Sequence, residues 1–308
     1  MTRKFNLQEY KKTIKSSDTP LKEDKFIALN DAIQAVLGLP GLPLGHVTQI
    51  FGLSDSGKTS ILFHAAAQAQ KQDILPVFII SEGKISWDRA KMMGIDENDC
   101  IVEYVSYLEE IFKKIDRIVS DVNSGRLPTN VMIFVDSIGN AVSVDSVKEN
   151  KDGTFEVGSA MMKAARVIRE NMRIFSHKIN NTRKVSSPYY VGLTFVNHAY
   201  RQPPQFPGAP TTLVPYGGDG IYLASSLVIR TKKARTLKAI SKGSQFGFGI
   251  VSKLSVDKNH ITNISNSGEF IIVSDSIIPN DKEALDDYKE AHKNSWHDGM
   301  EIHENEES

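Results

Sequence analysis

Cysteine is nearly absent from this sequence. Cys100 is the only one among 308 residues, so an internal disulfide framework is excluded and a reducing cytosol is the default compartment. Long apolar runs are absent too, because none approaches the roughly 20 residues that a membrane-spanning helix requires. The first residues lack the apolar core of a signal peptide, and we find no internal repeat and no coiled-coil heptad. These absences predict a cytoplasmic, globular protein with no membrane partner.

The composition fits one large domain or two small ones, with 40% hydrophobic and 24% charged residues. The formal net charge of zero is unevenly distributed. Residues 281–308 carry ten acidic side chains and three lysines, which gives −7 for this segment and therefore +7 for residues 1–280. A basic body with an acidic tail is typical of a polyanion-binding protein that carries its own electrostatic competitor. A merely solvated, disordered terminus would have the same charge, so charge alone leaves both interpretations open.

Residues 52–59 spell G-x-x-x-x-G-K-[ST], the pattern of a phosphate-binding loop. A predicted strand at residues 46–51 precedes the loop, and the strongly helix-forming residues 60–70 follow it. Its two glycines let the backbone curl so that N–H groups and the helix N-terminus face an anion. A chance turn before a helix is the alternative, but strand, loop and helix come in the order that the motif needs.

This loop predicts a nucleotide site with Mg²⁺. Lys58 would reach the β- and γ-phosphates, and the Thr59 hydroxyl would ligate Mg²⁺. The loop residues that we expect to bind the nucleotide are Gly52, Ser54, Asp55, Ser56, Gly57, Lys58, Thr59 and Ser60.

The rest of the chain alternates apolar runs with helical patterns. Predicted strands lie at residues 77–80, 101–105, 131–135 and 190–196, and predicted helices at residues 86–93, 108–122 and 159–178. Strand-forming segments follow at residues 226–231, 248–256 and 269–273. The alternation predicts a doubly wound α/β fold, with a mostly parallel central sheet flanked by helices and a ligand at the carboxyl ends of its strands.

Three polar residues directly follow predicted strands and would lie at that edge of the sheet. Asp136 ends an apolar run as in a Walker B strand, and it would hold Mg²⁺ beside Thr59. Glu82 could polarise the attacking water as a general base, although a surface glutamate in a turn is the commoner case. His198, which follows Asn197, could sense the γ-phosphate and pass that state to the next loop, or it could merely cap the strand.

Two loops carry features of nucleic-acid binding. Residues 199–220 hold five of the twelve prolines and almost no regular pattern, which is typical of a functional or a disordered loop. Residues 143–157 form a second loop. The cations, amide and aromatic side chains that suit a nucleic-acid backbone and its bases are Lys148, Lys151, Arg201, Gln202, Phe206 and Tyr216.

The helix predicted at residues 159–178 adds a basic stripe. Its members recur every three or four residues and are Lys163, Arg166, Arg169 and Arg173. A charge stripe is usually only a solvated face. The position of this one beside two loops at one sheet edge favours DNA.

In these motifs, residues 41–273 resemble the RecA family, and within it the UvsX-like recombinases of phages. The resemblance rests on GLSDSGKTS at residues 52–60, SEGKISWDRAKMMGID at 81–96, FVDSIGN at 134–140, FVNHAY at 195–200, GGDGIYLASSLVIRTKK at 217–233 and VDKNHIT at 256–262. It implies a RecA-like P-loop core that uses ATP and Mg²⁺ as a DNA-dependent ATPase. Such a protein forms a helical homo-oligomeric filament on single-stranded DNA and pairs that strand with homologous double-stranded DNA in recombination and repair.

The resemblance implies roles for single residues. Glu82 matches the family's catalytic glutamate, and His198 matches its γ-phosphate sensor, so both join Lys58 in the predicted catalytic set. Residues 143–157 and 199–216 match the two DNA-binding loops. Single-strand-binding and loader proteins are implied as partners, and a phage origin would place the protein in the host cytoplasm.

Four positions bear on how well the family pattern carries over. Lys258 and His260 match two cationic residues that reach the neighbouring subunit's ATP, but the second is normally Lys or Arg, so its charge here would depend on pH. Arg89 replaces the usual adenine-stacking tyrosine and could lie over the base by cation–π contact. Ile80 replaces an acid two residues before the catalytic glutamate.

The implied organisation has three parts. Residues 1–40 are expected to be an oligomerisation arm, residues 41–275 the ATPase core, and residues 276–308 an acidic tail in place of a separate DNA-gathering domain. A hexameric replicative helicase core of the same fold class is one alternative. It would assemble into closed rings, whereas a recombinase assembles into an open filament. A regulatory RecA-like paralogue without motor activity is the other, and the Ile80 and Arg89 changes keep it open.

Overall fold

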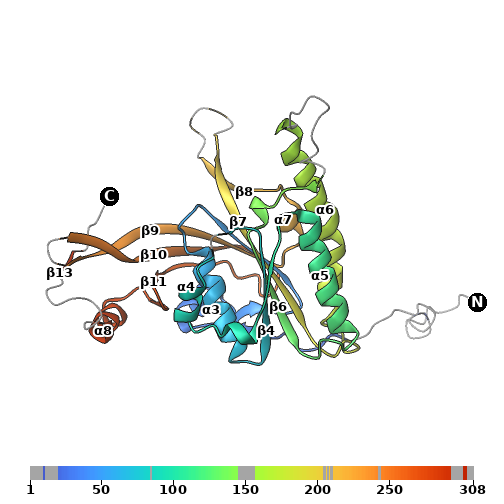
Figure 1. The fold of residues 1–308 in the computed structure, drawn as a ribbon, viewed down its shortest axis with the longest axis horizontal. Coiled ribbons are helices and arrows are strands. Elements are labelled where there is room, and N and C mark those ends of the chain that lie inside the picture. Colours follow the sequence, from blue (N-terminus) through green and yellow to red (C-terminus); the bar gives the residue numbers. More distant parts are fainter. Residues whose placement is uncertain are drawn as a thin grey trace, which may run out of the picture.

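The computed structural model describes residues 10, 20–83, 85–144, 157–203, 206, 208, 211–241, 244–292 and 301–303. One large twisted sheet dominates it (Figure 1). The strands run in the order β12 (Ile277–Pro279), β11 (Ser267–Ile272), β10 (Ser244–Asn259), β9 (Leu227–Ser241), β3 (Val47–Gly52), β7 (Val191–Gln202), β6 (Asn130–Asp136), β4 (Ile74–Ile80) and β5 (Ile101–Tyr104).

The sheet has two halves of different construction. From β9 to β5 neighbouring strands pair in parallel, whereas β9, β10, β11 and β12 pair antiparallel. Strands β4 and β6 are almost wholly buried, as expected for apolar strands covered on both faces. The predicted α/β fold with a mostly parallel sheet is confirmed.

Helices cover the parallel half on both faces (Figure 1). One face packs against α3 (Lys58–Gln70) and α4 (Trp87–Met92), and the other against α5 (Leu108–Asn123) and α6 (Val157–Asn181). Helix α2 (Asp31–Leu37) packs instead against β10 and β11 of the antiparallel half. On the first face the rings of Phe78 and Phe134 stack with centroids 5.4 Å apart, and on the second Phe112 and Phe175 stack at 5.7 Å. Two apolar layers therefore fix the parallel strands, and with them the edge where those strands end.

The antiparallel half extends from this core as the β9–β10 hairpin, with β13 (Glu301–His303) paired to β9. Helix α8 (Lys282–His292) packs Leu285 and Tyr288 against Leu237 and Val251 of the hairpin. The strand predicted at residues 226–231 is much longer than expected. Beyond residue 231, β9 continues through exposed lysines and an arginine. These residues do not alternate with apolar ones, so the sequence pattern predicted the end of the strand too early.

Residues 199–220 differ from the expectation of an unstructured loop. Strand β7 continues to Gln202, and β8 (Thr212–Pro215) pairs back on it antiparallel, so the segment forms a β-hairpin. Pro203 follows the first strand, and Pro215 ends the second, where a missing N–H is tolerated. A short helix α7 (Gly220–Ala224) follows.

The segments beside the core also pack on it. The strands β1 (Phe26–Ala28) and β2 (Gly41–Pro43) pair with each other, and Asn30 caps α2 and donates to the carbonyl of Ile277 at 2.7 Å. The division of the chain into an arm, a core and a tail at residues 40 and 275 stays a prediction.

Short 3₁₀ helices are η1 (Glu97–Asp99) and η2 (Ile138–Asn140). Within the described ranges, no helix is both long enough and apolar enough to cross a membrane.

Candidate nucleotide-binding site

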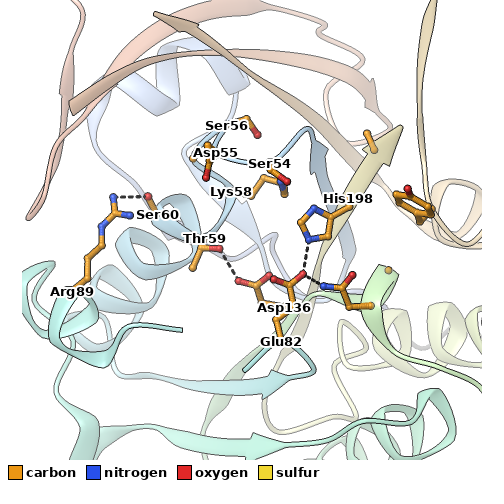
Figure 2. Close-up of a pocket in the computed structure, with 15 residues that line it drawn as sticks. Ser54, Asp55, Ser56, Lys58, Thr59, Ser60, Glu82, Arg89, Asp136 and His198 are labelled. Atoms are coloured by element: carbon orange, nitrogen blue, oxygen red, sulfur yellow. Dashed lines mark hydrogen bonds and ion pairs between the residues drawn. The ribbon is translucent and has the colours of Figure 1, made fainter. Parts of the chain in front are cut away.

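The carboxyl ends of β3, β4 and β6 meet His198 of β7 at a pocket of about 830 Å³ (Figure 2). Of the residues predicted to bind the nucleotide, only Gly52 does not line it. The residues that were predicted at the strand ends line it too, and these are Glu82, Asp136 and His198. The convergence follows from the parallel pairing, which brings the carboxyl ends of β3, β4 and β6 to one edge, where β7 passes beside them.

The loop between β3 and α3 is pressed against the antiparallel half of the sheet. Gly57 has φ +91°, and a Cβ there would lie 2.1 Å from Cδ1 of Ile272 in β11. The Ser252 hydroxyl of β10 donates to the Ser56 carbonyl at 2.8 Å. Helix α3 then begins at Lys58 with no side chain capping its N-terminus. The free N–H groups of its first turn and the helix dipole make this a site that attracts anions.

Lys58 places a buried cation beside that N-terminus. The side chain is 6% exposed, and its Nζ donates to the carbonyl oxygens of Gly52 at 3.1 Å and Leu53 at 2.8 Å. Burial lowers the pKa of Lys58, although Asp136 and Glu82 oppose that effect. Because both hydrogen-bond partners are neutral, the ammonium can still bind an anion in the pocket.

Thr59 and Asp136 lie within hydrogen-bond distance of each other. The Thr59 hydroxyl donates to Oδ2 of Asp136 at 2.8 Å, although 77 residues separate the two. Burial raises the pKa of Asp136, and the hydroxyl of Thr59 opposes that shift. No group of three or more His, Cys, Asp or Glu residues within the described part of the chain could hold a metal by itself. One carboxylate and one hydroxyl are the ligands with which a protein binds Mg²⁺ carried by a nucleotide.

Glu82 lies at the centre of a hydrogen-bond network (Figure 2). Its Oε1 accepts from the Ser137 hydroxyl at 2.6 Å, and from Asn140 Nδ2 and His198 Nε2. Burial opposes ionisation, but the hydrogen bonds from Ser137 and His198 and the charge of Lys58 outweigh it, so the pKa of Glu82 is lowered. The carboxylate is therefore ionised at neutral pH.

Sequence reasoning missed Ser137 and Asn140. Both lie in the segment FVDSIGN, directly after the strand that ends in Asp136, so the signal was proximity to a residue already singled out. Their partner Glu82 lies more than 50 residues earlier, and only the pairing of β4 with β6 brings the groups together.

His198 joins the pocket to the β7–β8 hairpin. Its backbone carbonyl accepts from the Tyr216 N–H at 2.9 Å, and the neighbouring Asn197 Nδ2 donates to the Tyr216 carbonyl at 2.7 Å. Tyr216 itself lines the pocket and packs its ring against Tyr200 at 5.1 Å. Tyr216, which was predicted to bind DNA, thus lies between the pocket and the hairpin.

Arg89 lies at the other end of the pocket, on α4 (Figure 2). Its Nη2 donates to the Ser60 hydroxyl at 2.9 Å and lies 3.5 Å from the carbonyl oxygen of Val273. Burial lowers the pKa of Arg89. The residue predicted to lie over the base is therefore at the pocket but anchored to its wall.

Lys258 and His260 do not reach this pocket. Lys258 is paired with Val228, and the His260 N–H donates to the Ser226 carbonyl, at the amino end of β9. The residue of β9 that adjoins the loop is Thr231, which is paired with Gly52 further along the strand. Lys258 Nζ donates instead to the carbonyls of Tyr222, at 2.9 Å, and Leu223. The two cations therefore lie at the sheet edge opposite the phosphate-binding loop.

The residues predicted to bind DNA are spread over the hairpin and α6. Lys148 and Lys151 lie outside the described residues, as does most of the loop at 143–157. The exposed residues are Arg166, Arg201, Gln202, Phe206 and Tyr216, whereas Lys163 is half-buried. Arg166 forms an ion pair with Glu170 at 2.8 Å.

Comparison with known proteins agrees with this geometry. Residues 16–278 match the family described as the RecA N-terminal domain. The chain belongs to the RecA family.

Curated RecA-family relatives match over most of the chain. The protein RecA of Aquifex aeolicus is 26% identical over 242 residues, which cover 79% of this chain and 63% of that protein. Protein RecA of Corynebacterium diphtheriae is 26% identical over 257 residues, covering 83% and 63%. Protein RecA of Mesoplasma florum is 30% identical over 205 residues, covering 67% and 56%. The chain spans less than two thirds of the length of these relatives.

Proposed function

We propose that this protein is an ATP-dependent DNA recombinase of the UvsX type. It forms filaments on single-stranded DNA and promotes homologous pairing and strand exchange, and it hydrolyses ATP to turn the filament over. The observation that carries the proposal is His198, which binds Glu82 through its ring and the β7–β8 hairpin through its backbone. The similarity to proteins named RecA supports it.

The pocket fits a nucleoside triphosphate. The uncapped start of α3 and the buried ammonium of Lys58 provide the positive potential that a polyphosphate needs. Thr59 and Asp136 would hold Mg²⁺, which neutralises charge on the phosphates when it is bound. Glu82, ionised and fixed by three donors, would orient and deprotonate the attacking water.

His198 would couple this chemistry to DNA binding. A ligand near Glu82 changes the charge that faces the His198 ring. Any shift of His198 then moves Tyr216, because the Tyr216 N–H donates to the His198 carbonyl. The hairpin bears Arg201 and Gln202, which are exposed and suited to a nucleic-acid backbone. Nucleotide state and DNA affinity would then be one linked equilibrium.

Lys258 and His260 support a head-to-tail assembly. Because they lie at the sheet edge opposite the phosphate-binding loop, a second copy stacked in the same orientation would bring them to its neighbour's ATP. When the rotation from one copy to the next does not close a ring, head-to-tail contacts of this kind produce a helical filament. Binding of ATP at such an interface promotes assembly by mass action.

Assembly tests the proposal. Wild type, Lys58→Ala and Glu82→Gln are incubated with single-stranded DNA and ATP, imaged by negative-stain microscopy and assayed for strand exchange. Lys71→Ala, an exposed lysine at the end of the same helix, is the control for loss of charge. We expect filaments for wild type, Lys71→Ala and Glu82→Gln, and none for Lys58→Ala. Closed rings with directional unwinding, or wild type that neither assembles nor hydrolyses ATP, would contradict it.

A further inference from the structure

The hydrogen bonds to Glu82 all end on one of its two carboxylate oxygens. The Ser137 hydroxyl, Asn140 Nδ2 and His198 Nε2 each contact Oε1, the first of them at 2.6 Å. Oε2 accepts no hydrogen bond from the residues that the structure describes. A carboxylate oxygen has about two lone-pair sites, so Oε1 is saturated while Oε2 keeps its lone pairs for a water in the pocket. One oxygen therefore holds the side chain, and the other is available as the base.

The three donors differ in how constant they are. His198 donates from Nε2 only while that nitrogen carries a proton, and the Ser137 hydroxyl can rotate to another acceptor. The amide nitrogen of Asn140 donates at any pH, and the amide oxygen would repel a carboxylate, so the nitrogen is the atom that faces Glu82. Asn140 is therefore the donor of this set that neither a change of pH nor the rotation of a hydroxyl removes.

Asn140 is carried by a short helix that is itself held in place. Helix η2 follows β6 directly, and Asn140 is its last residue, exposed and lining the pocket. One residue earlier, Gly139 touches the base of the β7–β8 hairpin, because a Cβ there would lie 2.7 Å from Asn197 Oδ1 and 3.3 Å from Tyr216 Cβ. The hairpin thus fixes η2 from one side, and the amide of Asn140 reaches Glu82 from a preorganised backbone.

We propose that Asn140 is a positioning residue for ATP hydrolysis, which holds Glu82 by Oε1 so that Oε2 serves as the general base. Oε2 takes a proton from the attacking water while the water oxygen bonds to the terminal phosphorus. The bond from that phosphorus to the bridging oxygen breaks, and the nucleoside diphosphate leaves. Asn140 acts through Glu82 alone, by keeping the base aligned with the water. This inference rests on the proposed function and deepens it.

Steady-state ATP hydrolysis tests the role of Asn140, with the full chain, Mg²⁺ and saturating single-stranded DNA at pH 8, 7 and 6. Asn140→Ala removes the donor. Asn140→Asp keeps the shape of the side chain, but its carboxyl group repels Glu82 while ionised and donates to it once protonated. Asn280→Asp is the matched control, because Asn280 Nδ2 donates to Glu269 Oε2 at 3.1 Å in the antiparallel half.

Each variant is compared with wild type at the same pH, since the titratable groups that face Glu82 are common to all of them. These groups are Lys58, Asp136 and His198. Asn140→Ala should lower kcat by about tenfold and leave KM for ATP within about twofold. Asn140→Asp should be the slower of the two variants at pH 8 and should gain at least about threefold relative to wild type by pH 6. Asn280→Asp should match wild type throughout.

Three results would overturn this inference alone. The first is an Asn140→Ala variant with the kcat of wild type, and the second is a rise in KM without a loss of kcat, which would assign the amide to nucleotide binding. The third is an Asn140→Asp variant whose loss is the same at every pH, which would assign Asn140 to structure. Wild type that hydrolyses no ATP in the presence of single-stranded DNA would instead overturn the proposed function, and this inference with it.

Discussion

The parallel and antiparallel halves of the sheet are built for different tasks. The parallel half is covered by helices on both faces. It brings Lys58, Asp136 and other charged groups to one edge, where few of them are exposed to solvent. The antiparallel half carries its charges outward, as in the exposed Lys232, Lys233 and Lys253 of the β9–β10 hairpin. Chemistry that needs a fixed, desolvated site belongs to the first, and long-range attraction of polyanions to the second.

The largest effect should come from Glu82→Gln in the parallel half. The amide keeps the shape of the side chain but cannot take a proton from water, so ATP turnover should fall by about 10²- to 10⁴-fold. Nucleotide affinity should change little, since the Lys58 contacts are intact. Steady-state hydrolysis and nucleotide titration measure the two quantities. Equal losses of binding and turnover would undermine the role of Glu82.

A buried histidine should make the stability of the parallel half depend on pH. Burial lowers the pKa of His64, on α3, from 6.5 to about 4. The neutral side chain contributes stability that is complete above pH 6.5 and is lost as the pH falls toward 4, because the unfolded state binds the proton first. The full shift corresponds to about 3 kcal/mol.

His64→Leu should remove that part of the pH dependence. Urea unfolding at pH 7.5, 5.5 and 4.5 should show wild type losing more stability than the variant over this interval. Gln68→Leu adds the same side chain to the same helix and should keep the wild-type slope. Parallel curves for wild type and His64→Leu would contradict the assignment.

The contact between the two halves can be broken at Gly57. Alanine there would place a Cβ against Cδ1 of Ile272 and force an unfavourable φ, so we expect a loss of about 1–3 kcal/mol in the free energy of unfolding and weaker nucleotide binding. Ile272→Val removes that Cδ1. In the double variant the steric part should be recovered, and a double-mutant cycle measures it. Strictly additive losses would show that the two halves are not coupled here.

The smallest effect belongs to the antiparallel half. Lys232 and Lys253 are directly opposite each other in the hairpin and both exposed, so their charges repel. Lys232→Glu should stabilise the fold by about 0.2–1 kcal/mol. It should also weaken DNA binding and flatten its salt dependence. Thermal unfolding and DNA titration at several salt concentrations test both, with Lys71→Glu as control. Unchanged DNA affinity would contradict the attraction of polyanions by the antiparallel half.

The same contrast explains what the sequence could predict. The phosphate-binding loop, Asp136 and Glu82 were found because each marks the end of an apolar strand, and parallel strands end together. The network around Glu82 could not be found, since Ser137 and Asn140 meet it only through strand pairing. The length of β9 was missed because its outward charges break the apolar alternation. The β7–β8 hairpin was missed because the prolines between residues 203 and 215 hid the continuation of β7 and the short strand β8.

The central claim is that the pocket is an ATPase site linked to DNA binding. Its most direct test is the rate of ATP hydrolysis with and without single-stranded DNA, measured for wild type and Glu82→Gln. We predict strong stimulation of wild type by single-stranded DNA, and turnover by the variant that is lower by at least about 10²-fold under either condition. A wild-type rate that single-stranded DNA leaves unchanged would contradict the account.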